Sequence, residues 1–333
     1  MKNRPHLILT YVFALAQLAP ARALLGQRSQ LLFVSNELSH DVSVVDIHSR
    51  RVVATVPVGA RVRGIQTSRD ARTVYAATTE MDRKARTGAA AIVAIDVATR
   101  RVIGRFPAGT DPEQFAVSRD GSKLFISNED AGAVSVLDID RRTLVSSAAV
   151  GVEPEGVAVS PDGHWIYVTA ETSSNVSVVD SRNGKVVATF LVDSRPRAAT
   201  FSPDGKRAYV TAEVGGTVSL VDPARRVVTL RARIGDGNAK PVGVIASPDG
   251  KRIYVAAGHG NTVSVLDSRT LHLLAAIPVG RRPWGLAQTR DGTLVFSADG
   301  LSNSVSVIDT GSNRVVARIP VGTRPWGVAV VER

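Results

Sequence analysis

Seven short apolar runs along the chain each end in an aspartate, and these aspartates recur at a nearly constant distance. The seven residues are Asp46, Asp96, Asp138, Asp180, Asp222, Asp267 and Asp309. The distances between consecutive aspartates are 50, 42, 42, 42, 45 and 42 residues. A unit of about 40 residues with four short strands buries only one face of its own sheet and needs similar neighbours to cover the other. The period therefore predicts an all-β fold: a seven-bladed β-propeller with four antiparallel strands per blade.

The repeat that begins at Glu155 shows the expected plan of one blade. Its four apolar or alternating runs cover residues 155–159, 165–169, 176–180 and 185–190. The turn Ser160-Pro161-Asp162-Gly163 between the first two recurs in other repeats. Proline fixes φ, aspartate accepts local backbone hydrogen bonds and glycine tolerates positive φ, so we interpret these aspartates as turn formers and not as calcium ligands. The run-ending aspartates are expected to accept N–H bonds in the next turn.

The two ends of the chain predict how the ring closes. The sequence ends on a lone inner-strand segment, residues 327–331, and the first repeat begins with a second-strand segment, residues 31–35. Pairing the C-terminal strand with the three N-terminal strands completes one blade and removes the exposed edges of an open array.

The first 23 residues have the pattern of a signal peptide. A charged start (Lys2, Arg4) precedes an apolar stretch from Leu7 to Leu18, and Ala21-Arg22-Ala23 fits a cleavage site. We expect residues 1–23 to be removed and residues 24–333 to form one propeller domain, periplasmic or secreted, with no membrane span after cleavage. An uncleaved N-terminal anchor is the alternative.

Composition and residue spacing limit the classes of partner and cofactor that we expect. The chain has no cysteine, so disulfides and covalently attached c-type haem are excluded. Its basic residues are scattered through every repeat, which argues against nucleic acid. The histidines at positions 6, 40, 48, 164, 259 and 272 never stand at metal-ligand spacing. We therefore predict no metal centre and no cofactor.

One face of the propeller is expected to vary between blades and to bind a ligand or partner. It carries the insertions near residues 81–90 and 234–240, and the connections before the first and after the second strand of each blade. Two rings of side chains should surround the channel there. The ring after the second strands consists of Glu37, Glu80, Glu129, Glu171, Glu213 and Asp299. The ring at the channel mouth includes Arg63, Glu113, Glu155, Arg197, Trp284 and Trp326.

Two alternatives apply to these candidate binding residues. The glutamates and arginines of adjacent blades could simply pair with one another. Trp284 and Trp326 could pack against neighbouring blades instead of contacting a ligand.

Several segments resemble a known repeat family. Tyr167-Val168-Thr169-Ala170 and Tyr209-Val210-Thr211-Ala212 resemble the Tyr-Val-Thr-Asn (YVTN) propeller repeat. The ordered series Asp111-Pro112-Glu113, Glu153-Pro154-Glu155, Arg195-Pro196-Arg197, Lys240-Pro241-Val242 and Arg324-Pro325-Trp326 is similar to β-propeller proteins associated with PQQ-dependent catabolism. That resemblance implies a periplasmic accessory protein beside quinoprotein alcohol dehydrogenases, c-type cytochromes and transport components.

From these features we expect a non-catalytic periplasmic binding or scaffold propeller, accessory to quinoprotein alcohol oxidation, with no catalytic residues. Its partner would be a quinoprotein dehydrogenase, a cytochrome c, a transport component or a small anionic ligand. One alternative is a lactonase-like hydrolase, in which Arg63, Glu113, Glu155 and Arg197 act on a small anionic substrate. Another is a surface adhesion protein. Fold alone does not decide among them.

Overall fold

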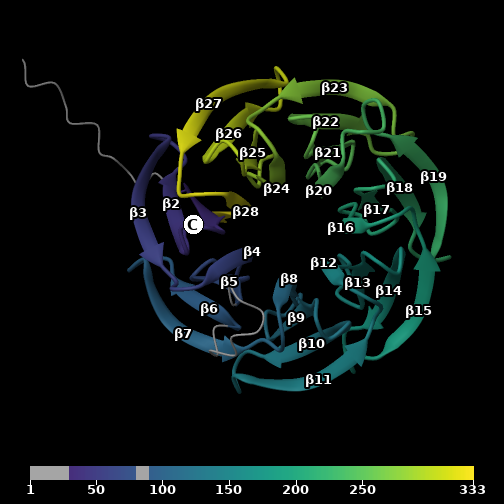
Figure 1. The fold of residues 1–333 in the computed structure, drawn as a ribbon, viewed down its shortest axis with the longest axis horizontal. Helices are drawn as coiled ribbons and strands as arrows, with labels where there is room; N and C mark the ends of the chain where they lie inside the picture. Colours follow the sequence, from purple (N-terminus) through teal and green to yellow (C-terminus); the bar gives the residue numbers. More distant parts are fainter. Residues whose placement is uncertain (1–29, 80–89) are drawn as a thin grey trace, which may run out of the picture.

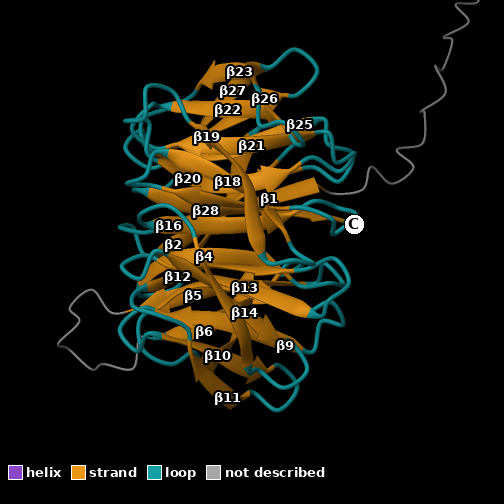
Figure 2. Cartoon of the chain, turned by 90° about the vertical axis from the view of Figure 1, so that its right-hand side faces the viewer, coloured by secondary structure: helices purple, strands orange, loops and turns teal. Residues whose placement is uncertain are grey.

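The strands of the protein form a closed ring of seven sheets, as predicted. A computed structural model describes residues 30–79 and 90–333, which contain 28 β-strands and no helix. The strands make seven four-stranded antiparallel sheets arranged around one axis (Figure 1). Seen from the side, the loops gather on two opposite faces of the ring (Figure 2).

The blades follow the chain in order, apart from the one shared by both ends. That blade consists of β28 (Pro325–Glu332), β1 (Gln30–Asn36), β2 (Asp41–Asp46) and β3 (Arg51–Pro57). The second consists of β4 (Arg61–Thr67), β5 (Thr73–Thr79), β6 (Ala91–Asp96) and β7 (Arg101–Pro107). The third consists of β8 (Pro112–Val117), β9 (Lys123–Asn128), β10 (Ala133–Asp138) and β11 (Thr143–Ala149). The fourth consists of β12 (Pro154–Val159), β13 (Trp165–Ala170), β14 (Asn175–Asp180) and β15 (Val186–Leu191).

The last three blades repeat this plan. The fifth consists of β16 (Pro196–Phe201), β17 (Ala208–Ala212), β18 (Thr217–Asp222) and β19 (Val227–Arg233). The sixth consists of β20 (Pro241–Ala246), β21 (Arg252–Ala257), β22 (Thr262–Asp267) and β23 (Leu273–Pro278). The seventh consists of β24 (Pro283–Gln288), β25 (Leu294–Asp299), β26 (Ser304–Asp309) and β27 (Arg314–Pro320).

Ring closure depends on the pairing of β28 with β1. These strands run antiparallel, with Leu32 opposite Val330 and Phe33 opposite Ala329. The C-terminal strand thus completes the blade begun by the N-terminal strands, which confirms the predicted closure.

The hydrophobic core lies between adjacent blades. The two middle strands of each sheet are buried almost throughout, because neighbouring blades cover both of their faces. Tyr167 of the fourth blade packs on Phe201 of the fifth, with ring centroids 4.7 Å apart. The outermost strands alternate between partly buried and exposed positions. Each blade therefore depends on its neighbours, as the repeat predicted.

The predicted turns are also confirmed. Asp138 Oδ1 accepts the backbone N–H of Arg141 at 2.9 Å, and the other run-ending aspartates accept equivalent bonds. In the Ser-Pro-Asp-Gly turn, Asp162 Oδ1 accepts the N–H of His164 at 3.0 Å, and Gly163 has a φ of +80°. Ala71 replaces this glycine in the second blade and adopts a φ of +56°.

Three expectations from the sequence concern residues that the structure does not describe. The signal peptide at residues 1–23, Glu80 and nearly all of the insertion at 81–90 lie outside the described residues. Within the described chain, no helix has the length and apolarity needed to cross a membrane.

Candidate active site at the channel mouth

The innermost strands of the blades place the predicted mouth residues around the axis. These strands are β4, β8, β12, β16, β20, β24 and β28 (Figure 1). Neighbouring blades hold the backbone of this ring in place: Ser35 Oγ donates to Arg63 O at 2.5 Å, and Ser127 Oγ donates to Glu155 O at 2.6 Å. The serine or threonine at this position thus links the second strand to the next inner strand in four blades, through Ser35, Ser127, Thr169 and Thr211.

Two adjacent cavities with shared lining residues lie along the axis. The channel cavity has a volume of about 410 Å³, and its deeper wall includes Val157, Val244 and Leu286. The mouth cavity above it has a volume of about 450 Å³ and is lined mainly by charged residues. Four of the predicted residues line both cavities: Glu155, Arg197, Trp284 and Trp326. We call this layer of side chains, where the mouth cavity and the channel cavity adjoin, the neck.

On one side of the mouth, Arg197 forms ion pairs with three glutamates. Its Nη2 lies 3.2 Å from Glu155 Oε1, its Nη1 contacts Glu171, and its Nε lies 3.7 Å from Glu213 Oε2. Arg195 lies above it, with its Nε 2.7 Å from Glu171 Oε2. Only 9% of the Arg197 side chain is exposed. The guanidinium is therefore held rigidly by three carboxylates, two from the fourth blade and one from the fifth.

On the other side of the mouth, Arg63 forms ion pairs with two glutamates. Its Nε lies 3.0 Å from Glu37 Oε1, and its Nη1 contacts Glu113 Oε2. Arg61 and Arg324 also bind Glu37, at 2.9 and 3.3 Å. The pairing alternative is thus confirmed for Glu37, as it is for Glu171 and Glu213.

Burial shifts the protonation of the inner carboxyls. It raises the pKa of Glu113 well above its usual value; the nearby Glu155 adds to the increase, and Arg63 opposes it. Burial also raises the pKa of Glu155, against the opposing charges of Arg197 and Arg63. For Arg63 burial acts in the opposite direction, but the surrounding glutamates prevail and its pKa is raised. Glu155 lines both cavities, and a carboxyl shifted in this way beside a cavity is typical of a functional site. Glu113 is fully buried and lines neither cavity.

The two tryptophans pack together at the neck. Their rings are stacked, with centroids 6.0 Å apart and planes 21° apart. The guanidinium carbons of Arg197 and Arg282 lie 5.2 and 4.6 Å from the centroid of the Trp284 ring. Trp284 and Trp326 therefore have a packing role and also form part of the wall of both cavities.

Asp299 lies apart from the residues that line the mouth and channel cavities. It is fully buried and accepts hydrogen bonds from Ser297 Oγ, Ser306 Oγ and Gly280 N at 2.9, 2.6 and 3.1 Å. It lines neither the channel cavity nor the mouth cavity. The structure therefore does not bring Asp299 together with the other candidate binding residues, because its carboxylate accepts hydrogen bonds within its own blade and from the loop before that blade.

Sequence reasoning missed other charged residues of the mouth. Arg195, Arg282 and Arg324 line the mouth cavity, and each precedes the proline that begins an inner strand. All three have positive φ, between 55° and 59°. The recurring X-Pro position was the available signal, since it places one side chain per blade on the rim.

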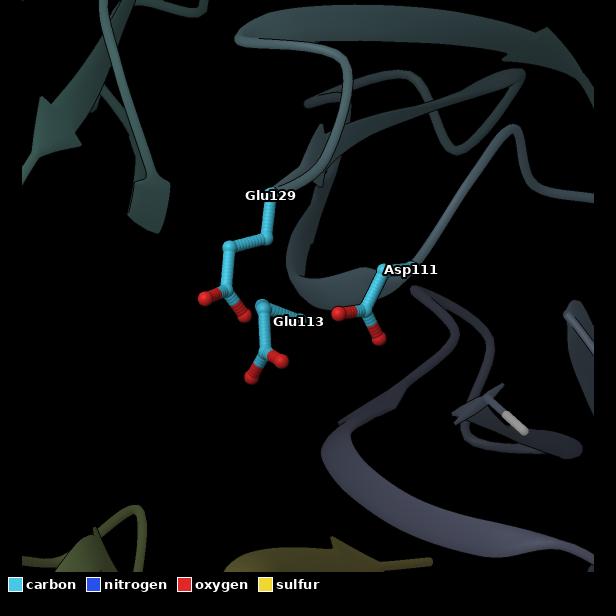
Figure 3. A group of neighbouring side chains, drawn as sticks. All are labelled: Asp111, Glu113 and Glu129. Carbon is cyan, nitrogen blue, oxygen red and sulfur yellow. The ribbon is translucent and has the colours of Figure 1, made fainter. Parts of the chain in front are cut away.

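An acidic group on the third blade was also missed. One carboxylate oxygen from each of Asp111, Glu113 and Glu129 lies within 4.8 Å of the others (Figure 3). Asp111 accepts a hydrogen bond from Thr79 Oγ1 at 2.6 Å. Histidine spacing could not reveal a group made only of carboxylates.

Comparisons with known proteins agree with this architecture. The sequence profile of a family described as "Lactonase, 7-bladed beta-propeller" matches residues 19–147 and 187–314. No curated protein matches the chain. Hydrazine synthase of Kuenenia stuttgartiensis is 25% identical with a TM-score of 0.75, covering 84% of this chain and 92% of the other. A candidate 6-phosphogluconolactonase from Bacteroides uniformis is 20% identical with a TM-score of 0.77, covering 92% and 100%. Another from Bacteroides fragilis is 19% identical with a TM-score of 0.74, covering 91% and 98%.

These findings correct the functional expectation. The prediction of a non-catalytic scaffold accessory to alcohol oxidation is wrong, and so is the prediction that the protein is no enzyme, because the family match points to a hydrolase. The alternative with Arg63, Glu113, Glu155 and Arg197 at the mouth fits better. The profile covers most of the chain, and the protein belongs to the family of seven-bladed β-propeller lactonases.

Proposed function

We propose that this protein hydrolyses a small lactone at the neck between the mouth and channel cavities. The observation that carries the proposal is the pairing of Glu155 and Arg197, which face both cavities with their charged atoms 3.2 Å apart. A carboxylate beside a fixed guanidinium supplies the two groups that ester hydrolysis needs: a proton acceptor for water and a stabiliser of the developing oxyanion.

Glu155 and Arg197 can carry out each step of lactone hydrolysis. Glu155 accepts a proton from a water molecule whose oxygen attacks the ring carbonyl carbon. Arg197 stabilises the negative charge that forms on the carbonyl oxygen. The ring C–O bond then breaks, and Glu155 returns the proton to the departing ring oxygen. The product is one hydroxy acid, and both groups end in their starting states.

The surroundings favour a small substrate. Cavities of about 410 and 450 Å³ lie toward the lower end of the usual range for small-molecule sites. Arg195, Arg282 and Arg324 also line the mouth cavity, where each is paired with a glutamate. The stacked tryptophans and Arg282 support the position of Arg197, so contacts within the protein hold this guanidinium in place.

The cellular setting is a further part of the proposal. The signal-like residues 1–23 support export, and the resemblance to YVTN propellers of PQQ-dependent catabolism supports work near periplasmic quinoprotein dehydrogenases. Oxidation of a cyclic hemiacetal gives a lactone. A lactonase beside such a dehydrogenase would consume its product, with no stable complex between the two proteins required.

A substrate panel tests the proposal. Purified protein is mixed with γ-, δ- and sugar-derived lactones, and acid release is followed by pH-stat against the spontaneous rate. We expect saturable turnover of at least one lactone and competitive inhibition by the lactam of the same ring size. Turnover of none of them above background would refute the proposed function.

A further inference from the structure

At the level of the neck, the ring of inner strands has a charged half and an apolar half. Blades two to five place Arg63, Glu113, Glu155 and Arg197 at this level, and blades six, seven and one place Val242, Trp284 and Trp326 there. The apolar half is continuous, because β20, β24 and β28 are neighbours around the axis (Figure 1). A lactone whose carbonyl faces Glu155 and Arg197 therefore has an aromatic and aliphatic surface on its opposite side.

Two residues further along each inner strand, the side chains are apolar in every blade. They are Ile65, Phe115, Val157, Ala199, Val244, Leu286 and Val328, and all but Phe115 line the channel cavity. A strand rises about 3.3 Å per residue, so this apolar layer lies about 7 Å from the neck. At about 1.5 Å per C–C bond, a chain of about four to six carbons reaches it. Gln66 and Thr200 bring polar groups back one residue deeper, so the apolar stretch is short.

The arginines of the mouth are already paired. Those that line the mouth cavity are Arg63, Arg195, Arg197, Arg282 and Arg324, and each forms an ion pair with a glutamate. Among the residues that the structure describes, the lining of the mouth cavity therefore has no spare guanidinium for a phosphate or carboxylate group. An anionic substituent would have to compete with a protein carboxylate for its arginine, and burying it without a partner is costly.

We propose that the substrate is a neutral lactone with a short alkyl chain, and that the channel cavity binds this chain. The inference rests on the proposed function, because it assigns the lactone ring to the same neck. The ring carbonyl faces Arg197, and the alkyl chain extends into the channel against Val157, Val244 and Leu286. Each methylene that leaves water there strengthens binding. A phosphate group on the substrate gains no such contact.

A series of lactones tests the substrate class. The purified protein is given γ-butyrolactone, γ-hexalactone, γ-octalactone, glucono-δ-lactone and the 6-phosphate of glucono-δ-lactone. We expect kcat/KM to rise by about two- to fourfold for each added methylene of the γ-lactones, mainly through a lower KM. The 6-phosphate should be hydrolysed no faster than glucono-δ-lactone itself. A kcat/KM that ignores chain length, or that rises when the phosphate is added, would overturn the inference.

Equilibrium binding separates this inference from the proposed function. Calorimetric titration with five-membered lactams that carry ethyl or butyl groups measures the alkyl site without any hydrolysis, and we expect the butyl lactam to bind more tightly. If no lactone is turned over and the butyl lactam still binds more tightly, the proposed function fails and the alkyl site stands. If lactones are turned over but neither KM nor lactam affinity depends on chain length, the alkyl site fails and the proposed function stands.

Filling the channel tests where the alkyl chain lies. Ala199→Leu narrows the channel cavity from the fifth blade, and Ala158→Leu narrows it from the fourth. Ala149→Leu is the matched control, because it adds the same atoms at an exposed position of the outer strand β11. The gain in kcat/KM from γ-butyrolactone to γ-octalactone should shrink by about tenfold or more in both channel variants and stay at the wild-type value in Ala149→Leu.

Melting temperatures show which of these variants fold, and Ala158→Leu alone decides the outcome if Ala199→Leu does not. An undiminished gain from the longer chain in a folded channel variant would place the chain outside the channel and overturn the proposal.

Discussion

Replacing Gly156 by alanine should damage both the stability and the active site. A Cβ at this position would lie 2.5 Å from Arg197 O and 2.8 Å from Ala198 Cα, both in the backbone of the next inner strand. A carbon and a carbonyl oxygen in contact are normally about 3.3 Å apart, so the strand that carries Arg197 would have to withdraw by about 0.8 Å. No flexible side chain can absorb this shift.

The stability loss follows from the size of the chain. Overpacking of this kind costs about 1–3 kcal/mol, which lowers the melting temperature of a domain of this length by roughly 2–5 °C. Displacement of Arg197 by nearly 1 Å should also reduce kcat/KM for a lactone by up to about 100-fold. Calorimetry and pH-stat kinetics on the same sample give both values.

Gly311→Ala is the control for Gly156→Ala. Its added Cβ would meet only Asp309 Oδ1 at 3.5 Å, an ordinary contact, and Gly311 does not have positive φ. We expect this variant to behave like the wild type. If Gly156→Ala also melted within about 1 °C of the wild type and kept full turnover, the packing argument at the neck would be refuted.

Two further predictions concern closure and charge. Deletion of residues 325–333 removes β28 and exposes the edge of β1. Light scattering should therefore show aggregation, or circular dichroism the loss of a cooperative transition. A melting temperature within about 2 °C of the intact protein would contradict this. Arg197→Met leaves buried carboxylates without their shared guanidinium and should reduce the free energy of unfolding in urea by about 3 kcal/mol, whereas an unchanged midpoint would show that Arg195 alone suffices.

The fold could be predicted because each part of the repeat has a local physical cause. The aspartate at the end of each third strand accepts turn N–H groups, as Asp138 does from Arg141. Proline, aspartate and glycine in the Ser-Pro-Asp-Gly turn act within four residues. Since the seven units are alike, local signals were enough to define the blades and the shared blade at closure.

The site could be predicted only in part, because its chemistry arises between blades. The sequence placed Arg63, Glu155 and Arg197 at the mouth, since their position in the repeat defines where they face. It could not show that Asp299 bonds within its own blade while Glu171 reaches Arg197 in the next. Function was missed for the same reason: no catalytic motif is contiguous in the chain.

The most direct test of the central claim compares Glu155→Gln with Glu153→Gln on the best lactone. Glutamine at 155 keeps the shape of the side chain but cannot accept the proton from water, and Arg197 keeps Glu171 and Glu213 as partners. We predict that kcat/KM falls by about 10²–10⁴-fold in Glu155→Gln, with the melting temperature nearly unchanged, and stays at the wild-type value in Glu153→Gln. Wild-type kcat/KM in Glu155→Gln would contradict the assignment of lactone hydrolysis to this site.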